Sequence, residues 1–269
     1  MKSIKYGVVL ASLVASHAAS ASVWGKVKNA FNDCKYSKEE YNQTYRSEMQ
    51  STQKLPDHFF GKFSESDFDS KPWMRDFIYV IVIDRAAKGA GAQSMRVYEN
   101  GRLIHKAKVS TGRETLELKR KNKSCTGAPP KSYWSNTPTG YFTPKYLSKD
   151  HVSSSWDSSM PYAIFYDIDN GLALHEVYSK YAGYLGSRAS GGCTRQDATS
   201  AQNLFNQVRS TEGRQIPMIR EDGTPVLDEA GRMIYITKQN FRSKTNPNYA
   251  TTFNTYSALI IVEDSSLTK

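Results

Sequence analysis

Residues 77–83 have the sequence FIYVIVI, an unbroken apolar run dominated by β-branched side chains. A run of this length and composition predicts a buried strand. A second run of the same kind, SALIIV at residues 257–262, lies near the C-terminus. Both stretches therefore predict strands that belong to the hydrophobic core.

Shorter strand signals flank turns between these two runs. Asn100 and Gly101 separate two strand-like stretches at residues 95–98 and 103–109, and an Asn-Gly pair between such stretches is the strongest short signal for a β-hairpin. Further strands are expected around turns rich in Gly, Pro, Asp and Asn, at residues 139–143, 162–168 and 172–175.

One helix is expected after residue 197. Asp197 can cap it and Gly213 can end it. Apolar residues recur between them with helical spacing, at Ala198, Ala201, Leu204, Phe205 and Val208. Many short strands with one clear helix predict a mostly β protein, a sandwich or a barrel.

The composition excludes several classes of protein. The chain has 269 residues, of which 39% are hydrophobic and 12% aromatic, which argues against disorder. The length suits one sizeable core with additions. No apolar run reaches the ~18 residues that a membrane-spanning helix needs, so no stable membrane insertion is expected.

The first 21 residues have the layout of a secretory signal peptide. Lys2 and Lys5 precede a short apolar stretch at residues 6–15, and residues 19–21 (ASA) form a small-x-small cleavage site. We therefore expect cleavage after residue 21 and export to the periplasm or cell envelope. A short buried helix at the start of the fold is the alternative.

The net charge restricts the kind of partner. It is formally +10, and cleavage would remove Lys2 and Lys5 and leave +8. A basic exported protein suits an anionic partner such as a cell-wall polymer or a membrane surface. Nucleic acid would fit the charge alone, but the predicted export argues against it. The basic run KRKNK at residues 119–123 is typical of a solvated loop.

The chain divides into an extension and a main domain. Residues 22–72 are polar and mostly helical in character, so we expect an N-terminal helical extension before a main domain at residues 73–269. Two polar stretches of the main domain, residues 113–136 and 214–255, are unusually long for loops. They are expected to be insertions that act as lids or binding surfaces.

The chain contains three cysteines, so one thiol remains if the other two pair in an oxidising compartment. Cys34 and Cys125 lie in polar, loop-like surroundings and could form a disulfide. Any of the three could be the odd one, but the local sequence singles out Cys193.

Cys193 follows two glycines in the segment SGGCTR at residues 190–195. The glycines allow a tight turn whose consecutive N–H groups can face a developing negative charge. Asp197 starts a helix four residues later, and the positive end of a helix dipole favours a thiolate. The alternative is a small buried thiol beside a turn.

His175 ends the apolar strand at residues 172–175, where a rigid element could hold a general base. Taken alone, it is better explained as a hydrogen-bonded imidazole at a strand end. The other histidines lie in the predicted signal peptide, the hairpin or polar loops: His17, His58, His105 and His151. No cluster of side chains has metal-ligand spacing, and no phosphate loop or dinucleotide motif is present, so neither a metal nor a cofactor is expected.

Together these features resemble the L,D-transpeptidase catalytic-domain family of bacterial cell-wall enzymes. The pattern of that family is a His, 14 to 17 residues, then Ser/Thr-His-Gly-Cys, a hydrophobic residue and Asn or Arg. Here 14 residues separate His175 from SGGCTR at residues 190–195. Segments similar to the family occur in the same order at residues 97–101, 109–112, 137–140, 160–162 and 185–186. The resemblance covers roughly residues 77–212 and the last strand.

Some positions depart from the family pattern. Gly191 stands where the family usually has His, and Glu176 follows the catalytic His where Gly is frequent. Thr194 is more polar than is usual at its position. The missing His side chain leaves the thiol, the base and the backbone donors in place, but it can change how a substrate is held.

The resemblance implies a catalytic pair. Cys193 would be the nucleophile, and His175 would be the general base and then the acid that protonates the leaving amine. The backbone carbonyl of Glu176 would orient the imidazole. The oxyanion hole would consist of the N–H groups of Gly191, Gly192 and Cys193.

The resemblance also implies contacts with substrate. Arg195 would bind a substrate carboxylate, or it would pack and form a salt bridge at the start of the helix. Tyr162 and Ser190 would belong to the substrate site, as pocket wall and local scaffold.

The implied donor is a tetrapeptide stem of peptidoglycan. Attack on the carbonyl before the terminal D-alanine would give a thioester, and an amine of a second stem would then form a 3–3 cross-link. Water as the acceptor would make the protein an L,D-carboxypeptidase. A wall-binding module without catalysis is a further alternative, and a general thiol protease is a weaker one. The sequence makes no prediction of oligomeric state.

The two insertions are expected to select the acceptor. We hypothesise that the stretch at residues 113–136 forms a lid, which a Cys34–Cys125 disulfide pins to the N-terminal extension.

Overall fold

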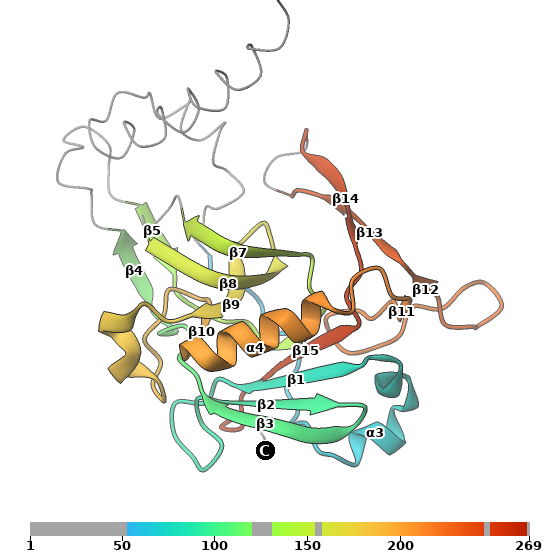
Figure 1. The fold of residues 1–269 in the computed structure, drawn as a ribbon, viewed down its shortest axis with the longest axis horizontal. Coiled ribbons are helices and arrows are strands. Elements are labelled where there is room, and N and C mark those ends of the chain that lie inside the picture. Colours follow the sequence, from blue (N-terminus) through green and yellow to red (C-terminus); the bar gives the residue numbers. More distant parts are fainter. Residues whose placement is uncertain (1–52, 120–130, 154–157, 245–247, 268–269) are drawn as a thin grey trace, which may run out of the picture. The chain divides into compact units, whose positions relative to one another are not determined.

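The computed structural model describes residues 53–119, 131–153, 158–244 and 248–267. Two main sheets and one long helix form the body of this part of the chain (Figure 1). The predicted signal peptide, Cys34, Cys125 and residues 22–52 of the predicted extension lie outside the described residues.

The first sheet has five strands in the order β3–β2–β1–β15–β6. Their bounds are β1 (Tyr79–Asp84), β2 (Ser94–Glu99), β3 (Arg102–Lys108), β6 (Gly140–Phe142) and β15 (Ala258–Glu263). The second sheet has the order β10–β9–β8–β7. Its strands are β7 (Tyr146–Ser153), β8 (Ser158–Asp167), β9 (Leu172–Glu176) and β10 (Thr194–Gln196). The mostly β architecture predicted from the sequence is confirmed.

The two apolar runs form the adjacent central strands β1 and β15. These strands pair in parallel from Tyr79 opposite Ala258 to Asp84 opposite Glu263, and every residue of both strands is buried. Parallel strands of this kind are covered on both faces, which explains why neither run alternates with polar residues. The prediction of two core strands is confirmed.

Two hydrophobic clusters cover the faces of the five-stranded sheet. On one face, side chains of β1, β2 and β15 pack against β8, β9 and the helix α4 (Ala198–Arg209). On the other face, residues 63–77 cover the sheet, and this stretch contains α3 (Asp67–Ser70) and η2 (Pro72–Asp76). The C-terminal part of the predicted extension therefore contributes side chains to the hydrophobic core.

The predicted hairpin and helix are also confirmed. Asn100 and Gly101 have φ angles of 50° and 77° between β2 and β3, as a two-residue turn of this type requires. The side chain of Asp197 accepts a hydrogen bond from the N–H of Ser200 at the start of α4. The helix ends at Arg209, four residues before Gly213 rather than directly at it.

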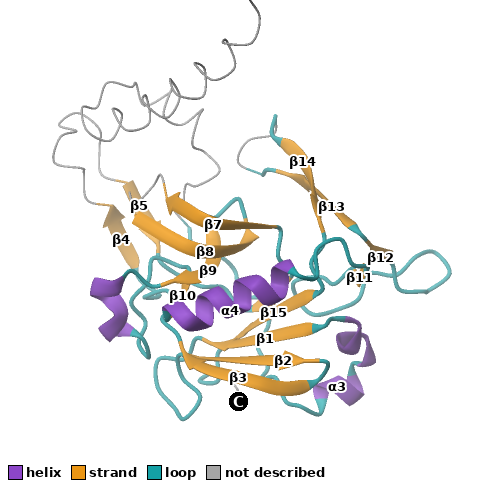
Figure 2. Cartoon of the chain, in the orientation of Figure 1, coloured by secondary structure: helices purple, strands orange, loops and turns teal. Residues whose placement is uncertain are grey.

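Both predicted insertions contain strands that the sequence analysis missed. The strands β4 (Leu116–Lys119) and β5 (Lys131–Trp134) pair in the first insertion. The second insertion forms two further pairs of short strands, which extend away from the sheets (Figure 2). They are β11 (Ile216–Pro217) with β12 (Tyr235–Ile236), and β13 (Lys238–Arg242) with β14 (Ala250–Asn254). Polar strands held by cross-strand hydrogen bonds lack the apolar runs that a sequence search detects.

Within the described ranges, no helix is long and apolar enough to cross a membrane.

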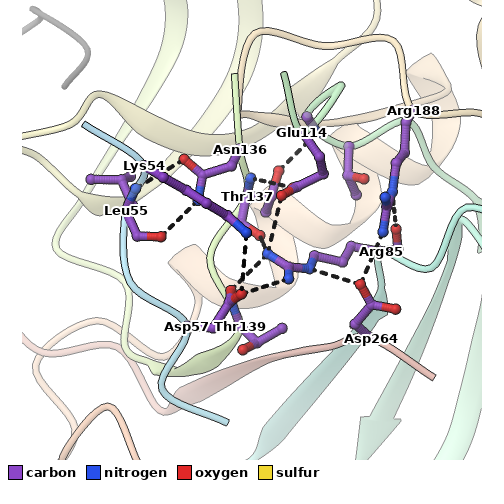
Figure 3. Close-up of polar contacts among 12 residues, drawn as sticks. Lys54, Leu55, Asp57, Arg85, Glu114, Asn136, Thr137, Thr139, Arg188 and Asp264 are labelled. Atoms are coloured by element: carbon purple, nitrogen blue, oxygen red, sulfur yellow. Dashed lines mark hydrogen bonds and ion pairs between the residues drawn. The ribbon is translucent and has the colours of Figure 1, made fainter. Parts of the chain in front are cut away.

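A buried arginine joins segments that are distant in sequence (Figure 3). The side chain of Arg85, which follows β1, is 2% exposed. Its guanidinium lies 2.8 Å from a carboxylate oxygen of Asp57, 3.2 Å from one of Asp264 and 3.6 Å from one of Glu114. It also donates to the backbone carbonyl of Thr137.

This cluster is nearly closed to water. Burial raises the pKa of Glu114, although Arg85 opposes that change. Burial acts in the same direction on Asp57, but hydrogen bonds from Arg85 and Thr139 outweigh it and lower the pKa of that carboxyl group. The carboxylates therefore depend on the arginine for their charge, and the arginine depends on them.

We expect Arg85→Met to destabilise the protein by about 3–5 kcal/mol, because it removes the shared counter-charge of three buried carboxylates, of which only Asp264 and Asp57 keep a second ion pair, with Arg188 and Lys54. Urea unfolding followed by circular dichroism measures this change. The matched control is Arg232→Ala, since Arg232 is 79% exposed and pairs with Asp228 on the surface. We expect that control to cost below about 1 kcal/mol. Equal effects of the two substitutions would contradict the role given to the cluster.

Candidate active site

Strands β9 and β10 bring His175 and Cys193 to one face of the four-stranded sheet. The two strands pair in parallel, with Arg195 opposite His175. Cys193 directly precedes β10, and its side chain packs against Met160, Ala163, Phe165 and Ala173. Because side chains alternate along a strand, His175 and Arg195 lie on the face that carries Ala173. We call this the site face, defined by Cys193, His175 and Arg195.

The imidazole of His175 is buried and oriented. The Nδ1 atom lies 2.6 Å from the backbone carbonyl of Glu176. A carbonyl oxygen can only accept, so the hydrogen bond requires the proton on Nδ1 and leaves Nε2 able to accept one. Burial and then the positive charge of Arg195 lower the pKa of His175 to about 3. The side chain is therefore a neutral base at pH 7.

The thiol of Cys193 is half-buried. Its Sγ atom donates to the backbone carbonyl of Gly171, at 3.3 Å. Gly171 lies in the turn between β8 and β9 with a φ of 66°. The turn that leads into the strand of His175 thus also contacts the candidate nucleophile.

Ser190 holds the loop that precedes Cys193. Its hydroxyl oxygen donates to the carbonyl of Cys193 and accepts from the N–H of Gly192 at 3.1 Å. The Ser190 side chain is fully buried, so it acts as scaffold and does not face a substrate. The predicted oxyanion donor Gly192 has this partner in the structure. The oxyanion roles of the Gly191 and Cys193 N–H groups remain predictions.

A second support for this loop was not predicted. The hydroxyl of Thr137 donates to the carbonyl of Gly192 at 2.6 Å and accepts from the N–H of Gly112 at 2.9 Å. A side chain at Gly112 would overlap the carbonyl of Ser135, because a Cβ atom there would lie 2.1 Å from that oxygen. Two of the family-like segments, residues 109–112 and 137–140, therefore meet beside the loop that precedes Cys193.

Arg195 lies among aromatic and basic side chains. Its guanidinium lies 5.6 Å from the ring centre of Tyr181 and donates to the carbonyl of Ala189 at 3.3 Å. Arg113 donates to the same carbonyl at 2.7 Å. In the part of the chain that the structure describes, no carboxylate lies within ion-pair distance of Arg195, so the predicted salt bridge at the helix start is not found. Burial lowers the pKa of Arg195, and the nearby Cys193 opposes that change.

Tyr162 does not line the site face, which corrects the sequence prediction. It packs against the cluster between the two sheets, and its ring lies 5.7 Å from that of Phe205 in α4. Its neighbour Ala163 belongs to the site face. Met160 and Ala163 both belong to the site face although they are three residues apart, so the alternation of β8 is interrupted between them, at Tyr162 with its φ of 55°, and the Tyr162 ring lies on the opposite side.

One histidine near the site was missed. His151 was assigned to a polar loop, but it lies in β7 opposite Met160. Paired residues share a face, so His151 also lies on the site face, and its ring is 4.8 Å from that of Phe165. Its charge contributes to the low pKa of His175. The polar sequence around it gave no strand signal.

Comparison with known proteins identifies a family. A family model, YkuD, described as the L,D-transpeptidase catalytic domain, matches residues 78–227. No curated protein matches the chain.

Several solved structures are similar to this chain. An L,D-transpeptidase (residues 123–326) from Xylanimonas cellulosilytica DSM 15894 is 22% identical, with a TM-score of 0.37, and the match covers 48% of this chain and 53% of that one. An L,D-transpeptidase from Mycobacterium smegmatis is 13% identical, with a TM-score of 0.38 and coverage of 69% and 58%. L,D-transpeptidase 3 from Mycobacterium tuberculosis, in complex with a faropenem-derived adduct, is 14% identical, with a TM-score of 0.38 and coverage of 70% and 61%. The chain thus spans less than two thirds of the length of these structures.

We expect the His175 ring to remain neutral from pH 8 to pH 5, because its pKa lies near 3. The chemical shift of its Cε1–H proton in NMR spectra should not titrate over this range. Arg195→Gln removes a nearby positive charge and should raise the pKa of His175. The control Arg232→Gln, on an exposed side chain, should leave it unchanged. A wild-type midpoint near 6.5 would mean that water reaches the ring, contrary to the structure.

Proposed function

The chain belongs to the L,D-transpeptidase catalytic-domain family, because the model of that family matches residues 78–227, and we propose that it is an exported peptidoglycan L,D-transpeptidase with Cys193 as its nucleophile. One observation carries the assignment of residues. Cys193, His175 and Arg195 lie on one face of adjacent strands, and the Nδ1 atom of His175 is held by the carbonyl of Glu176. This leaves Nε2 as the atom that can take a proton.

The first half of the proposed reaction acylates the enzyme. Sγ of Cys193 attacks the carbonyl carbon before the terminal D-alanine of a stem tetrapeptide, and the thiol proton moves to Nε2 of His175. Collapse of the tetrahedral intermediate breaks the C–N bond. Nε2 returns the proton to the leaving amine, D-alanine departs, and a thioester remains on Cys193.

The second half transfers the acyl group. An amine of a second stem attacks the thioester carbonyl, and its proton moves to His175. The C–S bond then breaks, the proton returns to the Cys193 sulfur, and a 3–3 cross-link is released.

The charges of the site suit this sequence of steps. The low pKa of His175 keeps the resting imidazole neutral, so Nε2 is free to accept the thiol proton. The guanidinium groups of Arg195 and Arg113 converge on the carbonyl of Ala189 and make the surroundings positive. Positive charge stabilises the oxyanion of the intermediate and the carboxylate of the substrate.

The test is incubation of the purified protein with disaccharide tetrapeptides, followed by mass spectrometry. We expect D-alanine release and dimers from the wild type. Cys193→Ala should give neither, because the nucleophile is lost. The surface variant Arg232→Ala should behave as wild type, and circular dichroism should show that both variants fold.

Other outcomes separate the alternatives. D-alanine without dimers would identify an L,D-carboxypeptidase. A wild-type protein that binds peptidoglycan but forms no product would contradict the proposal and indicate a wall-binding module. Export is tested separately: the mass of the mature protein should correspond to cleavage after Ala21.

We expect Thr137→Val to lower kcat about tenfold, with a smaller effect on KM. The substitution keeps the shape of the side chain but removes the hydrogen bonds to Gly192 and Gly112, and buried groups left without partners cost about 1–3 kcal/mol. Steady-state kinetics of D-alanine release measures this effect. Thr137→Ser keeps the hydroxyl and should restore most of kcat. A rise in KM with unchanged kcat would contradict a positioning role, and so would a failure of Thr137→Ser to restore kcat.

A further inference from the structure

A short helix beside the site, together with the residue that precedes it, presents three tyrosines to solvent. The helix η3 (Ser179–Tyr184) contains no buried residue. Tyr178, Tyr181 and Tyr184 are 48%, 36% and 55% exposed. In Figure 2 this helix is the purple segment at the left, next to β10. Clustered aromatic side chains on a surface mark binding sites more often than isolated ones do.

The spacing of three residues places these rings in a row. A 3₁₀ helix has three residues per turn, so Tyr181 and Tyr184 lie on one side of η3, and Tyr178, the residue before the helix, continues the row. The ring centres of Tyr178 and Tyr181 are 6.2 Å apart, and those of Tyr181 and Tyr184 are also 6.2 Å apart. We call these three residues the tyrosine ladder.

The ladder is held at both ends. Before it, the N–H of Val177 donates to the carbonyl of Gln196 in β10, at 2.7 Å. After it, the N–H of Gly186 donates to the carbonyl of Val109, also at 2.7 Å. The exposed rings are therefore presented by a segment that is tied to the framework of the site.

The ladder is continuous with the candidate active site. The ring of Tyr181 lies 5.6 Å from the guanidinium of Arg195, which is paired with His175 across the strands. The ammonium group of Lys180 lies 5.1 Å from the ring centre of Tyr178 and 4.9 Å from that of Tyr181. Lys180 is itself exposed, so its side chain can move aside when a ligand occupies the rings.

We propose that the tyrosine ladder binds the glycan strand that carries the stem peptides, an inference that rests on the proposed function. Pyranose rings have apolar C–H faces that stack on aromatic rings, and tyrosine hydroxyls can bond to sugar hydroxyls and acetamido groups. The rings are spaced at two intervals of 6.2 Å, on the scale of a few sugar rings, and neighbouring rings are tilted by 62° and 49° to one another. A stem of four residues spans at most about 14 Å, so a glycan on the ladder can present its stem to the neighbouring Cys193.

Binding is tested with glycan strands from which an amidase has removed the stem peptides. Cys193→Ala is the background, so that no turnover occurs, and calorimetry gives the affinity. Tyr178→Ala/Tyr184→Ala should weaken binding about tenfold or more. Tyr178→Phe/Tyr184→Phe keeps the rings and should bind within about threefold of the background protein. Tyr249→Ala, which removes a tyrosine of similar exposure in the second insertion, should have no effect.

A second measurement uses the protein with Cys193 intact. The rate on glycan-linked tetrapeptide, divided by the rate on free tetrapeptide, should fall about tenfold in the double Ala variant and stay unchanged in Tyr249→Ala. If the wild type acts on neither substrate, the proposed function fails, while the binding test of the ladder remains decisive.

Two results would overturn the inference itself. One is equal glycan affinity of the background protein and the double Ala variant. The other is a fall of the unfolding temperature by more than about 4 °C in the double Ala variant, which would show that the rings cover another part of this chain.

Discussion

A buried guanidinium group connects the core of this protein with its candidate site. Arg85 remains charged inside the fold only because carboxylates and a carbonyl replace its water. Asp57 and Glu114 come from segments on either side of it in the sequence, and Asp264 follows the last strand. The carbonyl contact comes from Thr137, whose hydroxyl also bonds to Gly192. Thr137 therefore contacts both the buried guanidinium of Arg85 and the loop that precedes Cys193.

The side chains of β9 alternate between the hydrophobic core and the site face. Leu172 and Leu174 pack into the cluster between the two sheets, whereas Ala173 belongs to the opposite face. His175 follows on that opposite face, and the carbonyl of the next residue holds its ring. The hydrogen bond to that carbonyl sets the orientation of the imidazole before a substrate arrives.

The site combines a neutral base with positive surroundings. Burial and Arg195 hold the pKa of His175 low, so the resting pair in the proposed mechanism is a thiol and an imidazole rather than two ions. The same arginine faces the tyrosine ladder on its other side, through Tyr181. Arg195 thus lies between the proposed reaction centre, where negative charge would develop, and the tyrosine ladder, where a glycan would bind. The Gly191 departure from the family pattern leaves this arrangement intact.

Elements with local signals are the ones that the amino-acid pattern predicts correctly. The runs at 77–83 and 257–262, the turn at Asn100 and the helix cap at Asp197 depend on neighbouring residues, and all are found as predicted. Contacts between groups that are distant in sequence come from the fold, because they leave no spacing in the sequence to detect. The structure alone showed the partners of Arg85, the polar strands of the insertions and the hydrogen bond that engages the Gly192 N–H. It also decided that Tyr162 faces the core, since the side of a strand that faces a site depends on which sheet covers it.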